Sequence, residues 1–530
     1  LFRDNGQLGS CFCFDRSKAG EQRHEKVLPT IIHDLANLHP VVRKAVKDVV
    51  EDAKDQASSS YVESQWEYLM LPLFAKFATP ATAASLALIG PILIVIDALD
   101  ESGDSGTRKS LLSILAGGKG GVEKLPPNVR VLLTSRPLDD IHGALTKSRY
   151  VYRKSMDKIP KTSTCSDITR YITDRLKHLL DEGQVEKLAL TSQGLFQWAY
   201  LACEYMLGHH VDGKGTGAGL SHTKRFNKLC PDTSRQATHG DELLYSMYTT
   251  ILDESFSIKD DDVCKQFCSV MSQILVTREP LPRGSLNMMR DYMPDIPAED
   301  KDISPVIDSM GALLSGVSDP LIPIQPIHAS FYDYLTSKSA SGDFFAGLEV
   351  TNTQRGMVQS TLAVMEEKLC FNIAGVKTSY HKNADDALAV AAKEIPPELR
   401  YACKHWCGHL TTLSYDSDLA KSVEYLLYEQ FPFWLEVLSL TRSLWTTSVP
   451  FAQVITWFQE ENGKLSEFAR DALQFIRLFA TPISQSVPHI YLSALPFAPR
   501  ESLVYRKYIP RLRYSLTVAE GQMETWPNLQ

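Results

Sequence analysis

Two short segments, Ile92–Ile96 and Val129–Thr134, constrain the fold of this chain most strongly, because each is a nearly continuous run of isoleucine, valine and leucine. A strand with one exposed face alternates apolar and polar residues, whereas a strand of a parallel sheet is covered on both faces and reads as an apolar run. We therefore predict that the two segments are strands of a parallel α/β sheet with both faces covered.

The residues around these strands continue the alternation of strand and helix. The run Gly9–Phe14 suits a further buried strand, and apolar residues recur at helical spacing from Lys26 to about Val50. A second helix is predicted over Gln65–Phe77. The sequence thus predicts an α/β unit over roughly its first 150 residues, which is about the length of one domain.

After about Tyr150 the pattern becomes helical, and the predicted helical stretches cover residues 168–180, 188–206, 242–289 and 347–480. A proline-spaced segment, Leu321–Ile327, interrupts them and is predicted to be extended. In the last helical stretch we expect four tryptophans to anchor the core: Trp406, Trp434, Trp445 and Trp457. At 530 residues the chain is long enough for several domains.

Composition and charge argue against some classes of partner. The chain carries 55 Lys and Arg against 63 Asp and Glu, so its net charge of −8 gives no general attraction to nucleic acid or to an anionic membrane. The uncharged stretch from Phe77 to Ile96 is broken by Gly90-Pro91 and ends in a strand, so we expect no membrane span. The ten cysteines lack regular spacing and no signal peptide precedes them, which favours reduced thiols in a cytoplasmic protein.

A cluster of zinc-binding residue types, Cys403, His405, Cys407 and His409, lies within one predicted helix. On a helix the two cysteines share one face, while the two histidines lie about 200° around the axis from it. One ion cannot reach all four side chains, so we predict a packed helix rather than a zinc site.

The first candidate for chemistry is the acidic end of the segment Ile92–Ile96, which continues as Asp97-Ala-Leu-Asp100-Glu101. P-loop NTPases present a carboxylate to Mg²⁺ from the end of such an apolar strand, and open α/β sheets place their ligands at the strand tips. Asp97 is therefore the candidate Mg²⁺ ligand, and Asp100 and Glu101 are candidates for orienting the attacking water. The alternative is a core strand followed by a solvated acidic turn.

The second candidate is Arg136, which follows the segment Val129–Thr134 in the sequence Thr-Ser-Arg-Pro. In P-loop ATPases the strand beside the acidic one ends in a polar residue near the γ-phosphate, and a guanidinium there could sense or stabilise the phosphate charge. The alternative is a surface arginine in a loop bent by Pro137.

The motif "LIVIDALDES", followed by "VRVLLTSRP", resembles the NACHT group of STAND ATPases, in particular the fungal NACHT families with a nephrocystin-3-like N-terminal segment. The resemblance continues in "GLFQWA" from Gly194, "IHASFYDYL" from Ile327, "YACKHWCGHL" from Tyr401 and "SALPFAP" from Ser493. The last of these resembles the junction into a WD-repeat propeller. The resemblance implies a P-loop NTPase fold with a parallel sheet, followed by a mostly α-helical region that includes a winged helix.

The resemblance also assigns roles to individual residues. It implies that Asp97 binds Mg²⁺, that Asp100 and Glu101 form the acidic pair near the catalytic water, and that Arg136 is the sensor arginine. His328 matches the winged-helix histidine that reaches the β-phosphate of bound ADP, a role that suits an imidazole N–H donor. The alternative for His328 is a packed core histidine beside Phe331.

The resemblance implies five domains in order: an α/β NTPase core over residues 1–150, a small helical domain over 151–240, a winged-helix-like domain over 241–345, a helical domain over 346–490, and a linker toward a WD-repeat propeller over 491–530. The phosphate loop G-x-x-x-x-G-K-[ST] does not occur in these 530 residues. The segment Gly208–Gly215 approaches the pattern but lacks the Ser or Thr and follows a predicted helix, so we interpret it as a chance match. The first residue is Leu1, and we expect a chain cut after the phosphate loop.

The function implied is a nucleotide-dependent signalling switch, in which ADP holds the domains together and ATP releases them to oligomerise, serving nonself recognition or cell death. ATP or ADP with Mg²⁺ would be cofactors of the full-length parent. We expect none of them to bind tightly to this chain, which lacks the phosphate loop, and we expect no measurable ATPase activity from it alone. The expected partners are other copies, through the NTPase module, and an unidentified protein ligand. Two alternatives are a non-catalytic scaffold with a degenerate NTPase fold and a metal-dependent hydrolase, which would lack a nearby His or Cys ligand set.

Overall fold

The structure is a computed structural model that describes residues 2–15, 24–53, 61–77, 79, 90–103, 105–106, 108–118, 120–155, 161–208, 210–211, 214–215, 221–230, 240–256, 261–347, 350–458 and 463–527. The chain divides into two compact units, Leu1–Ser163 and Thr164–Gln530, and each is described by itself. The finer domain boundaries expected from the sequence remain predictions.

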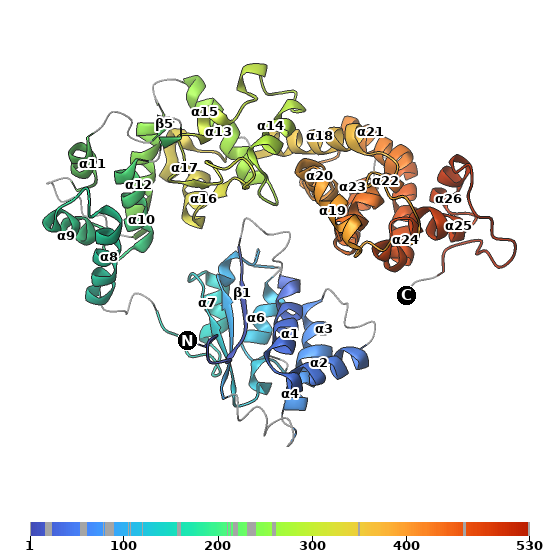
Figure 1. Ribbon diagram of the computed structural model, residues 1–530, viewed down its shortest axis with the longest axis horizontal. Helices are drawn as coiled ribbons and strands as arrows, with labels where there is room; N and C mark the ends of the chain where they lie inside the picture. The colour runs from blue at the N-terminus through green and yellow to red at the C-terminus, as the bar shows by residue number, and fades with distance from the viewer. Residues whose placement is uncertain are drawn as a thin grey trace. The chain divides into compact units, whose positions relative to one another are not determined.

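The first unit contains a three-stranded parallel sheet in the order β1-β2-β3 (Figure 1). The strands are β1 (Leu8–Cys13), β2 (Ile92–Asp97) and β3 (Val129–Leu133). The acidic strand β2 is central, with Cys13 of β1 opposite Asp97 and Val129 of β3 opposite Ile92. The predicted parallel pairing of the two apolar segments is confirmed.

The helices of the first unit are α1 (Val27–Leu38), α2 (Pro40–Ala53), α3 (Val62–Gln65), α4 (Leu71–Phe77), α6 (Lys109–Leu115) and α7 (Asp139–Thr146). A π-helical turn over Trp66–Met70 joins α3 to α4. The single helix predicted from Lys26 to Val50 is instead α1 and α2. The break falls at His39, whose backbone is extended (φ −156°, ψ 145°), because the ring of Pro40 disfavours a helical conformation in the residue before it.

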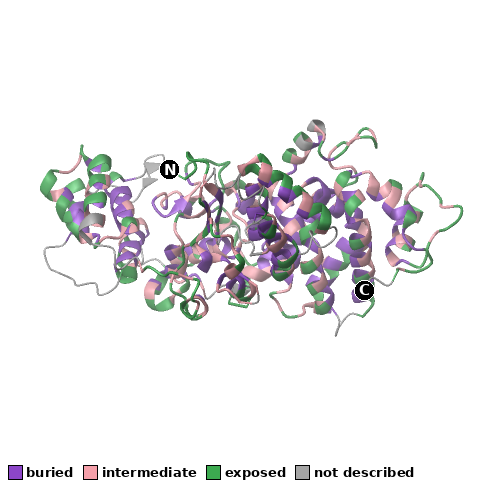
Figure 2. Cartoon of the chain, turned by 90° about the horizontal axis from the view of Figure 1, so that it is seen from below, coloured by how far each residue is buried: buried purple, intermediate pink, exposed green. Residues whose placement is uncertain are grey.

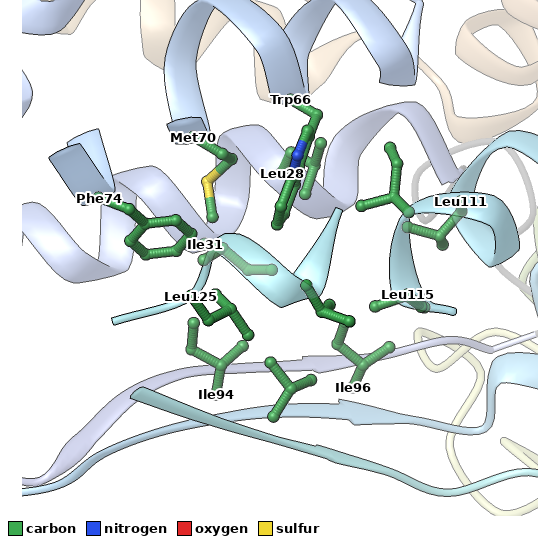
Figure 3. A pocket seen from close by; sticks show the side chains of 13 residues that line it. Leu28, Ile31, Trp66, Met70, Phe74, Ile94, Ile96, Leu111, Leu115 and Leu125 are labelled. Carbon is green, nitrogen blue, oxygen red and sulfur yellow. The ribbon is translucent and has the colours of Figure 1, made fainter. Parts of the chain in front are cut away.

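The core of this unit lies on one face of the sheet. Ile92, Ile94 and Ile96 are buried there, and Figure 3 shows side chains of α1 and of the π-helical turn, including Leu28 and Trp66, directed toward the sheet. They enclose a cavity of about 20 Å³ that is lined almost wholly by apolar side chains. A cavity of this size and lining holds at most one water and has no polar groups to fix a ligand, so it is not a candidate site.

The opposite face of the sheet is only partly covered by the described residues. Leu93 and Val95 of β2 are half-buried, Arg130 of β3 is exposed, and Leu132 is 50% exposed. The expectation that both faces are covered is therefore wrong for this part of the sheet. The apolar run of β2 and β3 predicted two covered faces because the pattern records which residues are apolar, not which of them meet a helix.

The second unit is mainly helical, as predicted. Its helices are α8 (Lys161–Leu176), α9 (Glu182–Thr191), α10 (Phe196–Leu207), α11 (His222–Leu229), α12 (Gly240–Ser255), α13 (Asp261–Val276), α14 (Arg283–Asp291), α15 (Ser304–Ile307), α16 (Ala329–Thr336), α17 (Lys338–Ser341), α18 (Val350–Lys368), α19 (Asp386–Glu394), α20 (Pro397–Leu410), α21 (Ser417–Tyr425), α22 (Phe431–Leu440), α23 (Leu444–Phe458), α24 (Gly463–Gln485), α25 (Leu495–Phe497) and α26 (Leu503–Tyr508). The single helix predicted over residues 188–206 is α9 and α10, because Gln193 and Gly194 both have positive φ and end α9.

Two short antiparallel strand pairs accompany these helices: β4 (His210–Val211) with β5 (Lys214–Gly215), and β6 (Leu314–Ser315) with β7 (Gln325–Pro326). The first pair contains the described part of the segment that imitates a phosphate loop, and it follows α10 rather than a strand. The second pair, extended by a bridge between Leu281 and Ile324, includes part of the predicted extended segment. Helices with a small antiparallel pair are compatible with a winged helix, which stays a prediction.

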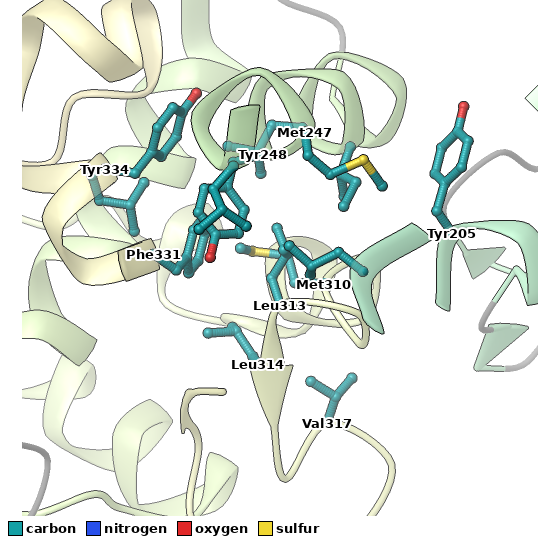
Figure 4. Packing of buried hydrophobic residues seen from close by; sticks show 14 of the residues in the cluster. Tyr205, Met247, Tyr248, Met310, Leu313, Leu314, Val317, Phe331 and Tyr334 are labelled. Atoms are coloured by element: carbon teal, nitrogen blue, oxygen red, sulfur yellow. The ribbon is translucent and has the colours of Figure 1, made fainter. Parts of the chain in front are cut away.

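Two apolar clusters form the core of the second unit, one over residues 168–357 with Tyr401 added, and the other over 358–508. Figure 4 shows the first, where Tyr248 of α12 packs against Phe331 and Tyr334 of α16 with ring centroids 5.0 and 5.4 Å apart. Figure 2 shows that buried residues concentrate on the inward sides of the helices and exposed residues on their outer sides.

The tryptophans of the second cluster follow the prediction only in part. Trp406 and Trp434 are fully buried with ring centroids 5.7 Å apart, and Trp457 is partly buried against the same cluster. Trp445 is 60% exposed, so the prediction that it anchors the core is wrong. It is the second residue of α23, whose buried face carries Leu444 and Phe451, and its side chain points away from that face.

The predicted packed helix at the Cys/His cluster is α20, where Cys403, His405, Cys407 and His409 are all buried. Burial raises the pKa of Cys403 and Cys407 and lowers that of His405 and His409, although Glu279, 3.2 Å from Nε2 of His405, acts on the pKa of His405 in the opposite direction. Among the described residues no group of three or more His, Cys, Asp or Glu side chains is placed to hold a metal ion. Over the same residues, no helix has the length and apolar character that crossing a bilayer requires.

Candidate functional site

The candidate site lies at the carboxyl ends of β2 and β3, where Asp97 is the last residue of its strand. The hydroxyl of Thr134, directly after β3, donates a hydrogen bond to the Asp97 carboxylate. The same hydroxyl accepts a hydrogen bond from the backbone N–H of Ala98 at 3.0 Å. Parallel pairing of the two strands brings these residues together, and Thr134 thereby fixes the orientation of the candidate Mg²⁺ ligand.

The chain turns sharply after Asp97. Ala98 has left-handed backbone angles (φ 54°, ψ 47°), and a 3₁₀ turn over Leu99–Glu101 follows. For a residue other than glycine, the left-handed backbone conformation costs about 1–2 kcal/mol, so contacts with neighbouring residues must hold Ala98 in it. Thr134 makes two such contacts: its hydroxyl accepts a hydrogen bond from the Ala98 N–H, and its backbone carbonyl accepts one from the Leu99 N–H at 3.0 Å.

Asp100 is paired with Arg136 inside this turn. Asp100 is 7% exposed, and its carboxylate accepts a hydrogen bond from the Arg136 backbone N–H at 3.1 Å. Its other oxygen lies 3.5 Å from Nε of Arg136, whose side chain is 40% exposed. The structure therefore brings together the predicted Asp97, Asp100 and Arg136, with Glu101 half-buried on the same turn.

Arg108 is a residue of this region that the sequence did not reveal. Its buried guanidinium donates to Asp140 of α7 at 2.5 Å and to the backbone carbonyls of Gly103 and Asp100 at 2.6 and 3.1 Å. The hydrogen bond from Arg108 lowers the pKa of the Asp140 carboxyl. Arg108 thus joins both ends of the acidic turn to α7. In the sequence, Arg108 is distinguished only by its position directly before the apolar residues of α6.

Two thiols of β1 lie beside Asp97. Cys11 and Cys13 are both exposed, with their sulfurs 3.9 Å apart, and Cys13 is the cross-strand neighbour of Asp97. Partial burial, the Cys11 thiol and the Asp97 carboxylate together raise the pKa of Cys13 to about 11. Cys13 is therefore protonated at neutral pH.

His328 belongs to the second unit, where it is the N-cap of α16. Its Nδ1 accepts a hydrogen bond from the Ser330 backbone N–H at 3.2 Å and lies 2.6 Å from the Ser330 hydroxyl, which in turn contacts the Tyr248 hydroxyl at 2.7 Å. The ring is half-buried. A capping role of this kind satisfies a free helix N–H and was not predicted.

The residues at the end of β2 fit a magnesium ion. Mg²⁺ prefers oxygen ligands, keeps several waters and takes one or two carboxylates from the protein. Asp97 offers a half-buried carboxylate held by a second polar group, Thr134. The phosphate side of such a site is missing from these 530 residues, since the glycine-rich loop motif does not occur in them.

Comparison with known proteins found one similar family and one similar protein. Residues 1–136 match the family model described as nephrocystin 3, N-terminal. The chain is 23% identical to the vegetative incompatibility protein HET-E-1 of Podospora anserina over 434 aligned residues, which cover 74% of this chain and 29% of the relative. It thus spans less than a third of that protein. No solved structure matches. Residues 1–136 are thus similar to the nephrocystin 3 N-terminal family, in agreement with the resemblance of the motifs.

Proposed function

We propose that this chain is part of a STAND-type signalling switch controlled by ATP and ADP. The observation that carries the proposal is the convergence of Asp97, Asp100 and Arg136 at the ends of two neighbouring parallel strands, with Thr134 holding Asp97 in place. Apolar packing alone would not require two carboxylates and a guanidinium at one sheet edge. Ligands of open α/β sheets bind at this edge.

Each residue then has a distinct task. Mg²⁺, when bound, would neutralise charge on the β- and γ-phosphate oxygens, and Asp97 would hold it. The Arg136 side chain, which pairs with Asp100, would give up part of this ion pair to contact the γ-phosphate. Its position would then depend on whether ATP or ADP is bound. Glu101 would orient the attacking water, and Asp100 would share that task or fix Arg136.

The phosphate-binding elements would come from another segment or another chain. The sheet has room for them, since β3 pairs only with β2 among the described strands and its Leu132 is half exposed. A further strand could pair at this edge and place a phosphate loop beside Asp97. Arg108 would keep the acidic turn in position when that happens.

The output of the switch is proposed from the relative. HET-E-1 is named a vegetative incompatibility protein, and we infer a comparable role for this chain in nonself recognition or cell death. Assembly would occur through the NTPase module, in response to an unidentified protein ligand. In the closed state a winged helix would present His328 to the β-phosphate of ADP, in addition to its capping of α16. The cytoplasm is the compartment that we expect.

The second candidate function is a scaffold that no longer uses nucleotide. It is favoured by the pairing of Asp100 with Arg136 within the protein. Calorimetry separates the two. The 530-residue chain should bind ATP weakly, and a longer form with a G-x-x-x-x-G-K-[ST] loop ahead of residue 1, the loop-bearing form, should bind it tightly with Mg²⁺. No gain of binding in the loop-bearing form would favour the scaffold.

A further inference from the structure

The two thiols on β1 are placed to share one metal ion. Cys11 and Cys13 are separated by one residue on an extended strand, so both point to the same side of the sheet. Both are exposed, and their sulfurs lie 3.9 Å apart. Two thiolates on one tetrahedral ion, with metal–sulfur bonds of about 2.3 Å, place their sulfurs about 3.8 Å apart. The observed separation therefore matches that of a bidentate thiolate pair without movement of the backbone.

A direct disulfide fits the same strand less well. Residues i and i+2 of an extended strand have Cα atoms about 6.6–6.8 Å apart, which is the upper limit for a disulfide with its S–S bond of about 2.05 Å. Oxidation would have to close nearly half of the present sulfur separation and bend β1 out of its pairing with β2. A single bridging ion leaves the strand as it is.

We propose that Cys11 and Cys13 form a binding site for a thiophilic d¹⁰ cation of the zinc class at the carboxyl edge of the sheet. Each thiol gives its proton to the buffer when the ion binds, and the two sulfurs become thiolate ligands. Among the described residues no group of three metal-binding side chains exists, so water completes the coordination. Soft sulfur ligands select such an ion over Mg²⁺, which prefers oxygen.

Metal binding at Cys11 and Cys13, the dithiol site, also affects the neighbouring carboxylate of Asp97. Cys13 is opposite Asp97 in the parallel register, and its thiol interacts with the Asp97 carboxylate. Binding of the ion removes the proton of the Cys13 thiol and with it the hydrogen bond that this thiol offers to the Asp97 carboxylate, so the candidate Mg²⁺ ligand loses one of its neighbours. This consequence rests on the proposed function, whereas the dithiol site itself does not.

The test uses the 530-residue chain with Cd²⁺, a probe of zinc-class sites whose bonds to thiolates give an ultraviolet charge-transfer absorption. We expect saturable absorption at one equivalent, loss of it in Cys11→Ser and in Cys13→Ser, and displacement of Cd²⁺ by added Zn²⁺. The matched control is the double variant Cys264→Ser/Cys268→Ser, which removes two half-buried cysteines one turn apart on α13. It should retain the signal.

Three results would overturn the dithiol site. They are absorption that persists in both single variants, absorption that disappears in the α13 control instead, and no saturable absorption in the parent chain. Asp97→Asn should keep the absorption, because the carboxylate is a neighbour of the site and not a ligand. Failure of the nucleotide-switch proposal would leave these results unchanged, so the two proposals fail independently.

Discussion

The buried guanidinium of Arg108 allows a quantitative test of how the acidic turn is held. Arg108→Met keeps a long side chain but removes hydrogen bonds to the Asp140 carboxylate and to the carbonyls of Asp100 and Gly103. A hydrogen bond with a charged partner contributes about 1.5–3 kcal/mol, and losses within one network are not additive. Asp140 is 26% exposed and regains water, so we expect a local loss of about 3 kcal/mol rather than the larger cost of a fully buried pair.

Hydrogen–deuterium exchange measured by mass spectrometry reports this loss of local free energy for the acidic turn itself. A local measurement is needed because the chain has two units, and one unfolding free energy does not describe both. Since about 1.4 kcal/mol corresponds to tenfold in an equilibrium constant, amides of residues 99–103 should exchange about 100-fold faster in Arg108→Met. The control is Arg130→Met, because Arg130 also donates to two backbone carbonyls but is exposed, and it should change stability by less than about 0.5 kcal/mol. Equal exchange in the two variants would refute the assignment of Arg108 as the residue that holds the turn.

Three further predictions concern pH, ADP and hydrolysis. Burial opposes ionisation of Glu279, but His405 and Lys404 lower the pKa of this carboxyl from its ordinary value of 4.5 to about 2. The ionised carboxylate therefore stabilises the folded state fully above pH 4.5, and this stabilisation is lost as the pH falls toward 2. Thermal unfolding of Glu279→Gln should therefore depend less on pH in this window, and an unchanged dependence would contradict the ion pair. In the loop-bearing form, His328→Ala should weaken ADP retention by roughly 1.5–3 kcal/mol. His328→Asn, which can still cap α16, should weaken it as much, whereas normal ADP dissociation in the asparagine variant would reduce His328 to a cap. Glu101→Gln should bind ATP normally, hydrolyse it slowly and oligomerise more by light scattering; parent-like turnover would exclude Glu101 from catalysis.

The strands and their parallel pairing could be predicted from the sequence because long apolar runs in an α/β unit are typical of buried parallel strands. The residues at which helices begin and end were harder to predict from the sequence. Pro40 divides a periodic apolar pattern, and the positive φ of Gln193 ends α9 although the apolar spacing continues past it. Periodicity records which face is apolar, not where the backbone changes direction. Trp445 shows the same limit, since a large apolar residue is not obliged to face the core.

The candidate site was predictable where its residues belong to local motifs. Asp97, Asp100, Glu101 and Arg136 stand at strand ends, and parallel pairing brings three of them together. The same pairing brings Thr134 to Asp97, but an uncharged threonine was not marked as functional in the sequence. Arg108 was missed because its partner Asp140 lies 32 positions away and outside the paired strands. No local spacing encodes such contacts.

In the proposed switch the end of β2 holds a magnesium ion on a nucleotide, and calorimetric titration of ATP into the loop-bearing form tests this most directly. Asp97→Asn removes the charge aimed at the metal, and Asp139→Asn, which removes an exposed carboxylate from α7 of the same unit, is the control. We predict that Mg²⁺ strengthens ATP binding in the parent and in Asp139→Asn but has little effect in Asp97→Asn. Equal strengthening by Mg²⁺ in all three proteins would contradict the claim and leave the acidic turn as a structural feature of a scaffold.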